Sequence, residues 1–314
     1  MARFAVVRLL QAIPVLLLLS VAVFVLLELA PGDPALRVLT SQGVEQPDQR
    51  EVEALRARLG LDRPAWERYL RWLGDAARFD LGTSYVSREP VSSLLAERLP
   101  ASVTLAAVTA LVSAAIAIPL GTLAAVRRGL LDTVVRAGTL VFASAPSFWL
   151  SLVAIWLFST ELRWFPALAD FSPRGIVLPA AVLSLRSLAL VARLTRATVA
   201  DALAMPHIPV ARGRGLSESA VVIRHGLRNA LVPIVTVLGL DFAALVAGAA
   251  VVETVFTYPG VGRLAVQAAL AGDAPVVLGF VLVACTAVII VNALVDILAG
   301  FLDPTIRQPG SRVA

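Results

Sequence analysis

Long apolar stretches recur along the chain and are separated by shorter segments rich in charge. Four of them contain no charged residue and are near or above the roughly 20 residues that a helix needs to cross a membrane; they are residues 9–27, 99–126, 137–160 and 275–295. Two further stretches, 176–192 and 229–252, contain one charge each, Arg186 and Asp241. Because all six runs are continuous rather than alternating, the pattern predicts six transmembrane helices and excludes a β-barrel.

The composition supports an all-α membrane protein, since 58% of the residues are hydrophobic and only 16% are charged. Arginines gather in the terminal segments and in two short loops, including residues 193–228. The positive-inside rule places these segments, and with them both termini, in the cytoplasm. A cleaved signal peptide is the alternative to a first span, but 19 uncharged residues exceed the usual signal core. The net charge of +5 follows this topology and does not indicate nucleic acid binding.

Residues 31–98 lie outside the membrane in this topology and are predicted to form a helical cap. Pro31 ends the first span, and Pro100 opens the second. Between them, residues 51–59 and 64–79 show helical periodicity, with Trp66, Leu70 and Leu73 on one face. The chain therefore divides into a first transmembrane helix (1–30), an extracytoplasmic helical insertion (31–98) and a core that holds spans two to six (99–314).

Signs of catalysis or metal binding are missing from the sequence. All 27 basic residues are arginine, so the lysine of a Walker A nucleotide-binding loop is absent. His207 and His225 have no histidine, cysteine or carboxylate cluster at ligand spacing, which argues against a metal site. Cys285 is expected to pack inside the last span. We predict that the chain is not an enzyme and binds no cofactor.

The cytoplasmic loop 197–228 has the pattern of a helix, a glycine turn and a second helix. Gly213 and Gly215 interrupt the first helix, and Ser217 is placed as the N-cap of the second. One interpretation is a short helix across the ends of the spans that receives a push from a soluble motor. The alternative is a positive-inside loop without a partner.

The chain resembles the permeases of ATP-binding cassette (ABC) importers, of the B-type that serves dipeptides and oligopeptides. The motifs that carry the resemblance are RLLQAIPVLLLLSVAVF, APGDPA, RFDLGTSY, AERLPASVTLA, IPLGTLAAVRRG, ARGRGL, RHGLRNALVPIVTVLGL, VVETVFTYPGVGRL and VDILAGFLDPTIR. The resemblance implies a type I importer permease fold. It also implies that the coupling site comprises Val210, Ala211, Arg212, Gly213, Arg214, Gly215, Leu216 and Leu227. Pro206 and Pro209 depart from the family pattern in the coupling helix.

The resemblance further implies the partners. It predicts a second, C-type permease subunit, two ABC ATPase subunits or domains that hold ATP and Mg, and an extracytoplasmic peptide-binding protein. The expected substrates are di- and oligopeptides, with nickel chelates, glutathione or another small solute as alternatives. A secondary transporter driven by an ion gradient is the runner-up, although no inverted repeat supports it. A scaffold without transport is a third interpretation, which charges within the spans disfavour.

The loop at residues 253–275 is expected to fold back toward the pore mouth as a re-entrant loop. Its apolar side chains lie beside turn residues, and the candidate residues are Val255, Phe256, Thr257, Pro259 and Gly260. A surface loop packed on the cap is the alternative.

Arg186 and Asp241 are candidates for a pair inside the membrane or for contacts along the translocation path. Arg186 lies 15 residues before Asp201, and Asp241 lies 13 residues after Arg228. These offsets put both charges roughly 20 Å from the cytoplasmic ends of their helices. In the alternative, Arg186 extends to the cytoplasmic side and Asp241 lines water.

Overall fold

The computed structural model describes residues 2–44, 46–127 and 129–302, and every named element in this part of the chain is a helix. The elements are α1 (Ala2–Glu28), α2 (Pro34–Ser41), α3 (Gln49–Leu59), α4 (Ala65–Ala76), α5 (Val91–Val126), α6 (Leu130–Ser144), α7 (Ser147–Ala154), η1 (Ile155–Glu161), α8 (Val177–Leu203), α9 (His207–Gly213), α10 (Glu218–Val221), η2 (Val222–Leu227), α11 (Arg228–Gly248), α12 (Ala250–Val255), α13 (Val261–Ala271) and α14 (Ala274–Leu302). Here η1 and η2 are π-helical.

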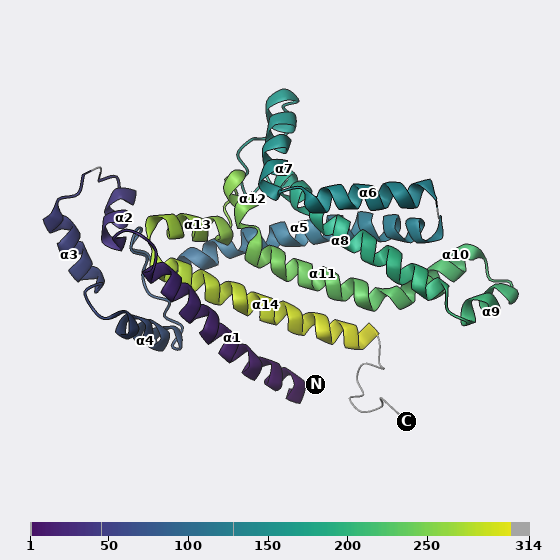
Figure 1. Cartoon of the computed structure of the whole chain (residues 1–314), viewed down its shortest axis with the longest axis horizontal. Coiled ribbons are helices and arrows are strands. Elements are labelled where there is room, and N and C mark those ends of the chain that lie inside the picture. Colours follow the sequence, from purple (N-terminus) through teal and green to yellow (C-terminus); the bar gives the residue numbers. More distant parts are fainter. Residues whose placement is uncertain (1, 45, 128, 303–314) are drawn as a thin grey trace.

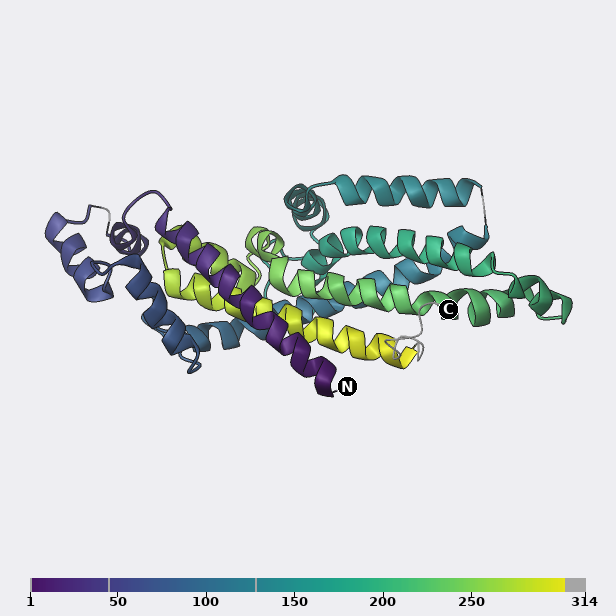
Figure 2. The same cartoon turned by 60° about the horizontal axis from the view of Figure 1, so that its bottom comes forward.

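The long helices lie side by side in an elongated bundle (Figures 1 and 2). Helices α2, α3 and α4 gather at the end where α14 begins, and α9 with α10 lies at the opposite end (Figure 1). Helix α8 is central, because it packs against α5, α6 and α11, while α14 packs against α11 and α1. The cap and the predicted coupling loop therefore occupy opposite ends of the molecule.

Four helices in the described part of the chain are long and apolar enough to cross a membrane. They are Val91–Val126, Val177–Leu203, Glu218–Ala247 and Ala274–Phe301. A bent pair counts as a fifth span, and the described apolar part of α1, Ile13–Glu28, is shorter than a full span. The prediction of six spans is thus confirmed for four or five of them, and the count of six stays a prediction.

The third predicted span, 137–160, is not one straight helix. Segments Asp132–Ser144 and Ser147–Glu161 meet at an angle of 99°, and the second stands away from the bundle axis (Figure 1). Pro146 explains the break, because it has no amide hydrogen and forces the preceding residue out of the helical region. Ala145 has an extended backbone, with φ −73° and ψ 128°.

Helix α5 corrects the predicted start of the second span. It begins at Val91, and Pro100 lies inside it instead of opening it. Packing on both sides of the proline holds the helix together. Leu94 and Leu95 pack with α13 before it, and Leu105 packs with the loop after α12 beyond it.

The two helices predicted in the cap are present as α3 and α4. Asp48 and Glu51 form a capping box at the start of α3. The buried face of α4 differs from the predicted one, because Trp72 is buried whereas Trp66 is 66% exposed and Leu70 is 56% exposed. Tyr69 of α4 packs against Phe24 of α1 and against Trp72, whereas Trp66 and Leu70 form an apolar face of α4 that stays exposed in the described part of the chain.

A buried carboxylate ties the cap to the bundle. Asp273, between α13 and α14, accepts hydrogen bonds from the Ser84 hydroxyl at 2.5 Å and from the Tyr85 amide at 3.0 Å. These two residues belong to the loop that joins α4 to α5. The position of the cap is therefore fixed relative to the start of α14.

Candidate functional site

The α9 end of the molecule holds the predicted coupling residues. Ile208 and Ala211 of α9 are buried against Val221 of α10, with Leu203 and Leu216 packed around them. This small core attaches α9 to the end of α8 and to the start of the helix that becomes α11. The small core therefore joins α9 to both long helices.

The outward face of this segment is open. Val210 is 57% exposed, and Arg212, Gly213, Arg214 and Gly215 are also exposed. Two further apolar side chains, Met205 and Ile223, are at least half exposed nearby in the sequence. Apolar and cationic groups together make a surface suited to docking a partner.

The turn after α9 depends on backbone conformation. Gly215 has φ +84°, and a Cβ atom built on it meets no atom within 4 Å. The demand for glycine is thus conformational and not steric. Arg212 and Glu218 close the turn with two hydrogen bonds of 3.0 and 2.7 Å. The rings of His207 and His225 also meet across it, with centroids 5.8 Å apart.

The helix starts in this segment hold one serine, Ser217, and two prolines, Pro206 and Pro209. The Ser217 hydroxyl accepts a hydrogen bond from the Ala220 amide, which confirms the predicted N-cap. Pro206 is the N-cap of α9, and Pro209 lies in its first turn, where no backbone amide is needed. The two prolines therefore do not interrupt helix α9.

The second helical piece does not lie across the ends of the spans. Helices α10, η2 and α11 form one continuous span, Glu218–Ala247, so the predicted start at residue 229 was too late. Leu227, the last coupling candidate, is half-buried in this continuous helix and packs with the core of α8. The turn at Gly215 therefore leads directly into a helix that is long enough to cross a membrane.

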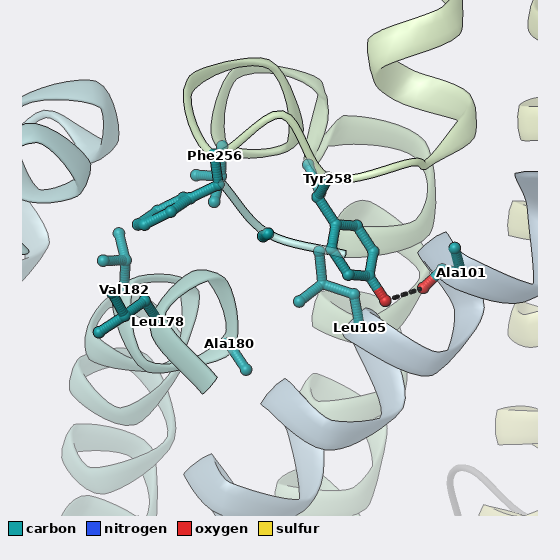
Figure 3. Close-up of a cluster of buried hydrophobic side chains, with 10 residues drawn as sticks. Ala101, Leu105, Leu178, Ala180, Val182, Phe256 and Tyr258 are labelled. Carbon is teal, nitrogen blue, oxygen red and sulfur yellow. Dashed lines mark hydrogen bonds between the residues drawn. The ribbon is translucent and has the colours of Figure 1, made fainter. Parts of the chain in front are cut away.

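The loop between α12 and α13 folds back on the bundle. Phe256 and Tyr258 are buried among Leu105, Leu178 and their neighbours from α5 and α8 (Figure 3). The Tyr258 hydroxyl donates to the Ala101 carbonyl at 3.2 Å (Figure 3). Burial raises the pKa of Tyr258 to about 12, which keeps this donor protonated. We call residues 253–263 the outer loop below.

Glu253 fixes the outer loop and was not singled out in the sequence analysis. Its carboxylate accepts from the Ser102 hydroxyl at 2.6 Å and from the Arg263 amide at 2.9 Å. The Ser102 oxygen also accepts from the Val261 amide at 2.9 Å. A Cβ atom on Gly260 would lie 2.3 Å from this carboxyl group. The one signal in the sequence was that Ser102 and Glu253 lie inside two of the motifs that carry the family resemblance, AERLPASVTLA and VVETVFTYPGVGRL.

The remaining outer-loop candidates lie around this clasp. Val255, Thr257 and Pro259 are half-buried. Thr257 has φ +60°, a left-handed conformation that is uncommon for a residue other than glycine. Its carbonyl accepts a hydrogen bond from the Arg263 guanidinium at 2.5 Å. A defined backbone turn, and not a flexible loop, therefore closes this end of the bundle.

Arg186 and Asp241 form no salt bridge in the isolated chain, although the charge of Arg186 acts on the Asp241 carboxylate, so their pairing stays a prediction. No nitrogen–oxygen contact within 4.0 Å joins Arg186 to Asp241. The Asp241 carboxylate instead accepts a hydrogen bond from the Ser187 hydroxyl. Successive helix residues point about 100° apart, so Ser187 and not Arg186 makes the direct contact with Asp241. Arg186 is exposed in the isolated chain.

Another ion pair within the bundle escaped the sequence analysis. Asp132 of α6 and Arg196 of α8 are joined by two hydrogen bonds, one of them 2.8 Å long, from Nη2 of Arg196 to Oδ2 of Asp132. The pair holds the first limb of the bent span to α8. No group of three or more metal-ligating side chains occurs in the described ranges.

These features define a class: a polytopic helical membrane protein with an exposed helical segment at one end, as expected of a transport permease. Residues 117–308 match the family described as the binding-protein-dependent transport system inner membrane component, and residues 1–106 match the N-terminal region of such membrane components. The chain belongs to this family. It is a multi-pass protein of the bacterial inner membrane and a peptide-type ABC importer permease.

Relatives of this chain are similar over nearly their whole length. The oligopeptide transport system permease protein AppB of Bacillus subtilis is 35% identical over 98% of this chain and 100% of its own. The glutathione transport system permease protein GsiC of Escherichia coli is 37% identical, covering 98% and 99%. A Brucella abortus protein, provisionally named a peptide transport system permease, is 40% identical, covering 96% and 97%.

A solved structure shows the same fold. A chain of the MetNI methionine ABC transporter, in an inward-facing conformation, aligns with a TM-score of 0.55 at 20% identity. The alignment covers 68% of this chain and 97% of the other. The type I importer permease fold predicted from the resemblance therefore has a structural counterpart.

Proposed function

We propose that this chain is one of two permease subunits that form the translocation path of an ATP-driven importer for di- and oligopeptides. ATP and Mg are held by separate ATPase subunits, and an extracytoplasmic binding protein delivers the substrate. The observation that carries the proposal is the exposed α9 surface, which is attached through a buried core to two membrane helices. The chain lacks the lysine of a Walker A loop, which agrees with ATP hydrolysis on separate subunits.

The proposed coupling works through continuity of the helices. ATPase closure would move α9, and the Gly215 turn would pass that motion to Glu218–Ala247 as one body. Helix α8 would follow, since Leu203 and Ile208 share the same small core. Switching between outward and inward openings then requires only that the two nucleotide states favour different positions of α9.

The substrate assignment rests on the relatives. Two of them are named for oligopeptide and glutathione transport, and glutathione is itself a small peptide. Arg186 and Asp241 are the candidates for contacts with charged ends of a peptide, because a charge within a span is costly unless it meets water or a partner. Nickel chelates and other small solutes are the alternatives that substrate profiling would separate.

The experiment uses the complete transporter reconstituted in vesicles with its binding protein. Gly215→Val should abolish stimulation of ATP hydrolysis by the binding protein and uptake of a labelled dipeptide, because valine strains the turn. Gly43→Val is the matched control, since Gly43 also has positive φ and open space but lies in the cap. Normal coupling in Gly215→Val would exclude the role of the turn. Uptake that continues without ATP and stops with a protonophore would favour a secondary transporter.

A further inference from the structure

A cavity of about 410 Å³ lies between the cap and the ends of α1 and α14. We call it the cap cavity. Its lining includes Phe24 and Glu28 of α1, Arg37 of α2, Trp72 of α4 and Pro275 of α14. None of these residues belongs to the coupling surface or to the outer loop.

The cap cavity carries more arginines than carboxylates, although two of the arginines, Arg63 and Arg71, pair with Glu67. Five arginines line it against two carboxylates, Glu28 and Asp75. Glu28 is already occupied, because it accepts a hydrogen bond from Arg68 at 2.5 Å. Arg37 forms no ion pair and no side-chain hydrogen bond with any described residue. A guanidinium that has no carboxylate partner inside a partly enclosed space is suited to bind an anion.

Three buried donors point to the same conclusion. Nε of Arg37, Nε of Arg68 and Nε1 of Trp72 are buried without a hydrogen-bond partner, and all three residues line the cap cavity. Trp72 is only 9% exposed. Buried polar groups without partners are rare in folded proteins. All three groups are donors, so an acceptor such as an oxyanion or a water molecule would satisfy them.

The cap cavity lies beside the ends of two apolar helices, α1 and α14. Its walls include the last turn of α1 and the first turn of α14, which are the points where two apolar helices end. The uncovered face of α4 presents Trp66 and Leu70, and a tryptophan on such a face is typical of a membrane interface. A phospholipid combines an anionic phosphate with apolar acyl chains, and these chains can lie beside the exposed apolar face of α4.

We propose that the cap cavity binds the phosphate of an anionic glycerophospholipid. Arg37, Arg68 and Trp72 donate hydrogen bonds to the phosphate oxygens, and the acyl chains follow the apolar face of α4. Lipid bound in this way fills the space between the cap and the bundle, so it stabilises the position of the cap. Free inorganic phosphate shares the headgroup chemistry but has no acyl chains.

The test measures binding of phosphatidylglycerol to the purified complete transporter by native mass spectrometry. We expect Arg37→Gln to weaken binding of one lipid by about tenfold, because it removes a charged hydrogen-bond donor. Trp72→Phe keeps the ring and removes only the indole donor, so it should weaken the same binding event. Arg50→Gln is the control, since Arg50 is an exposed arginine of α3 outside the cavity.

A second measurement separates lipid from free anion. Thermal unfolding is compared in phosphatidylcholine vesicles, in the same vesicles with phosphatidylglycerol, and in phosphatidylcholine with inorganic phosphate. Stabilisation by phosphatidylglycerol alone, lost in Arg37→Gln and kept in Arg50→Gln, supports the proposal. Equal stabilisation by inorganic phosphate would overturn the lipid assignment. Lipid binding unchanged in both Arg37→Gln and Trp72→Phe would overturn the site.

Discussion

Ser102 of α5 donates a hydrogen bond of 2.6 Å to Glu253 of α12, although 151 positions separate the two residues. The same serine oxygen accepts from the Val261 amide, and the second oxygen of Glu253 accepts from the Arg263 amide. One buried hydroxyl and one buried carboxylate thus join a membrane helix to both sides of the outer loop. This clasp holds the end of the bundle that lies away from α9.

Glu253→Ala should loosen the outer loop. It leaves the Ser102 hydroxyl and the Arg263 amide without their acceptor, and each buried unsatisfied group costs about 1–3 kcal/mol. We expect a lower melting temperature of the complex and faster hydrogen exchange at residues 253–263. Glu161→Ala, at an exposed glutamate in η1, is the control. Exchange that is equally slow in Glu253→Ala and the wild type would contradict the clasp.

The clasp should also respond to pH. Burial raises the pKa of Glu253 above 4.5, and hydrogen bonds from Ser102 and the Arg263 amide only partly offset this. A raised pKa means that the folded state binds the proton more tightly than the unfolded chain. The resulting stabilisation is complete below pH 4.5 and is lost as the pH rises through the raised value.

We therefore expect protection of the outer loop from hydrogen exchange, corrected for the intrinsic rate, to increase on acidification. Glu253→Gln mimics the neutral acid, so it should remove most of this pH dependence. Tyr258 also lies near the carboxyl group, but its pKa is raised to about 12, so its hydroxyl stays protonated in this pH range. The same pH dependence in Glu253→Gln and the wild type would assign it to another group.

Gly121 sets the distance between α5 and α8. A Cβ atom at this position would lie 2.6 Å from the Ala192 carbonyl oxygen and 2.8 Å from Cβ of Thr195. Small residues allow membrane helices to approach closely. Gly121→Val should destabilise the chain by about 1–3 kcal/mol through overpacking. Gly138→Val in α6 is the control, because open space surrounds it; equal melting temperatures of the two variants would refute the close contact.

Features that depend on neighbours in sequence were predictable. The N-cap at Ser217 and the glycine turn at Gly215 follow from short-range rules, and both are present. The apolar runs predicted the spans because lipid imposes a length on them. The bend at Pro146 had a local signal as well, yet the uninterrupted apolar run masked it, since hydropathy does not register a proline in the middle of a span.

Features that depend on residues far apart were not predictable. The Ser102 to Glu253 clasp and the pairing of Asp132 with Arg196 require knowledge of which helices are adjacent. The predicted pair of Arg186 and Asp241 illustrates the same limit, because a direct contact depends on how each helix is rotated as well as on the depth of its residues. The estimate of equal depth in the membrane stays a prediction, and the rotation of α8 about its axis decides that Ser187 makes the direct contact with Asp241.

The rotation of α8 gives Arg186 and Asp241 separate roles. Asp241 is half-buried and held by Ser187, whereas Arg186 is exposed in the isolated chain. An unpaired arginine near the middle of a span costs about 2.5–3.5 kcal/mol on insertion scales. The surface that surrounds it in the assembled transporter must therefore supply water, a second subunit or an anionic substrate group.

Arg186→Gln should impair uptake of a dipeptide with a free carboxyl terminus by about tenfold, which corresponds to ~1.4 kcal/mol of lost interaction. The amidated dipeptide has no carboxylate to pair with the guanidinium, so its uptake should change much less. Uptake of both peptides is measured in reconstituted vesicles at matched protein levels. Arg174→Gln, an exposed arginine just before α8, is the control. Equal losses for the acid and the amide would show that Arg186 serves the contact between subunits instead of the peptide.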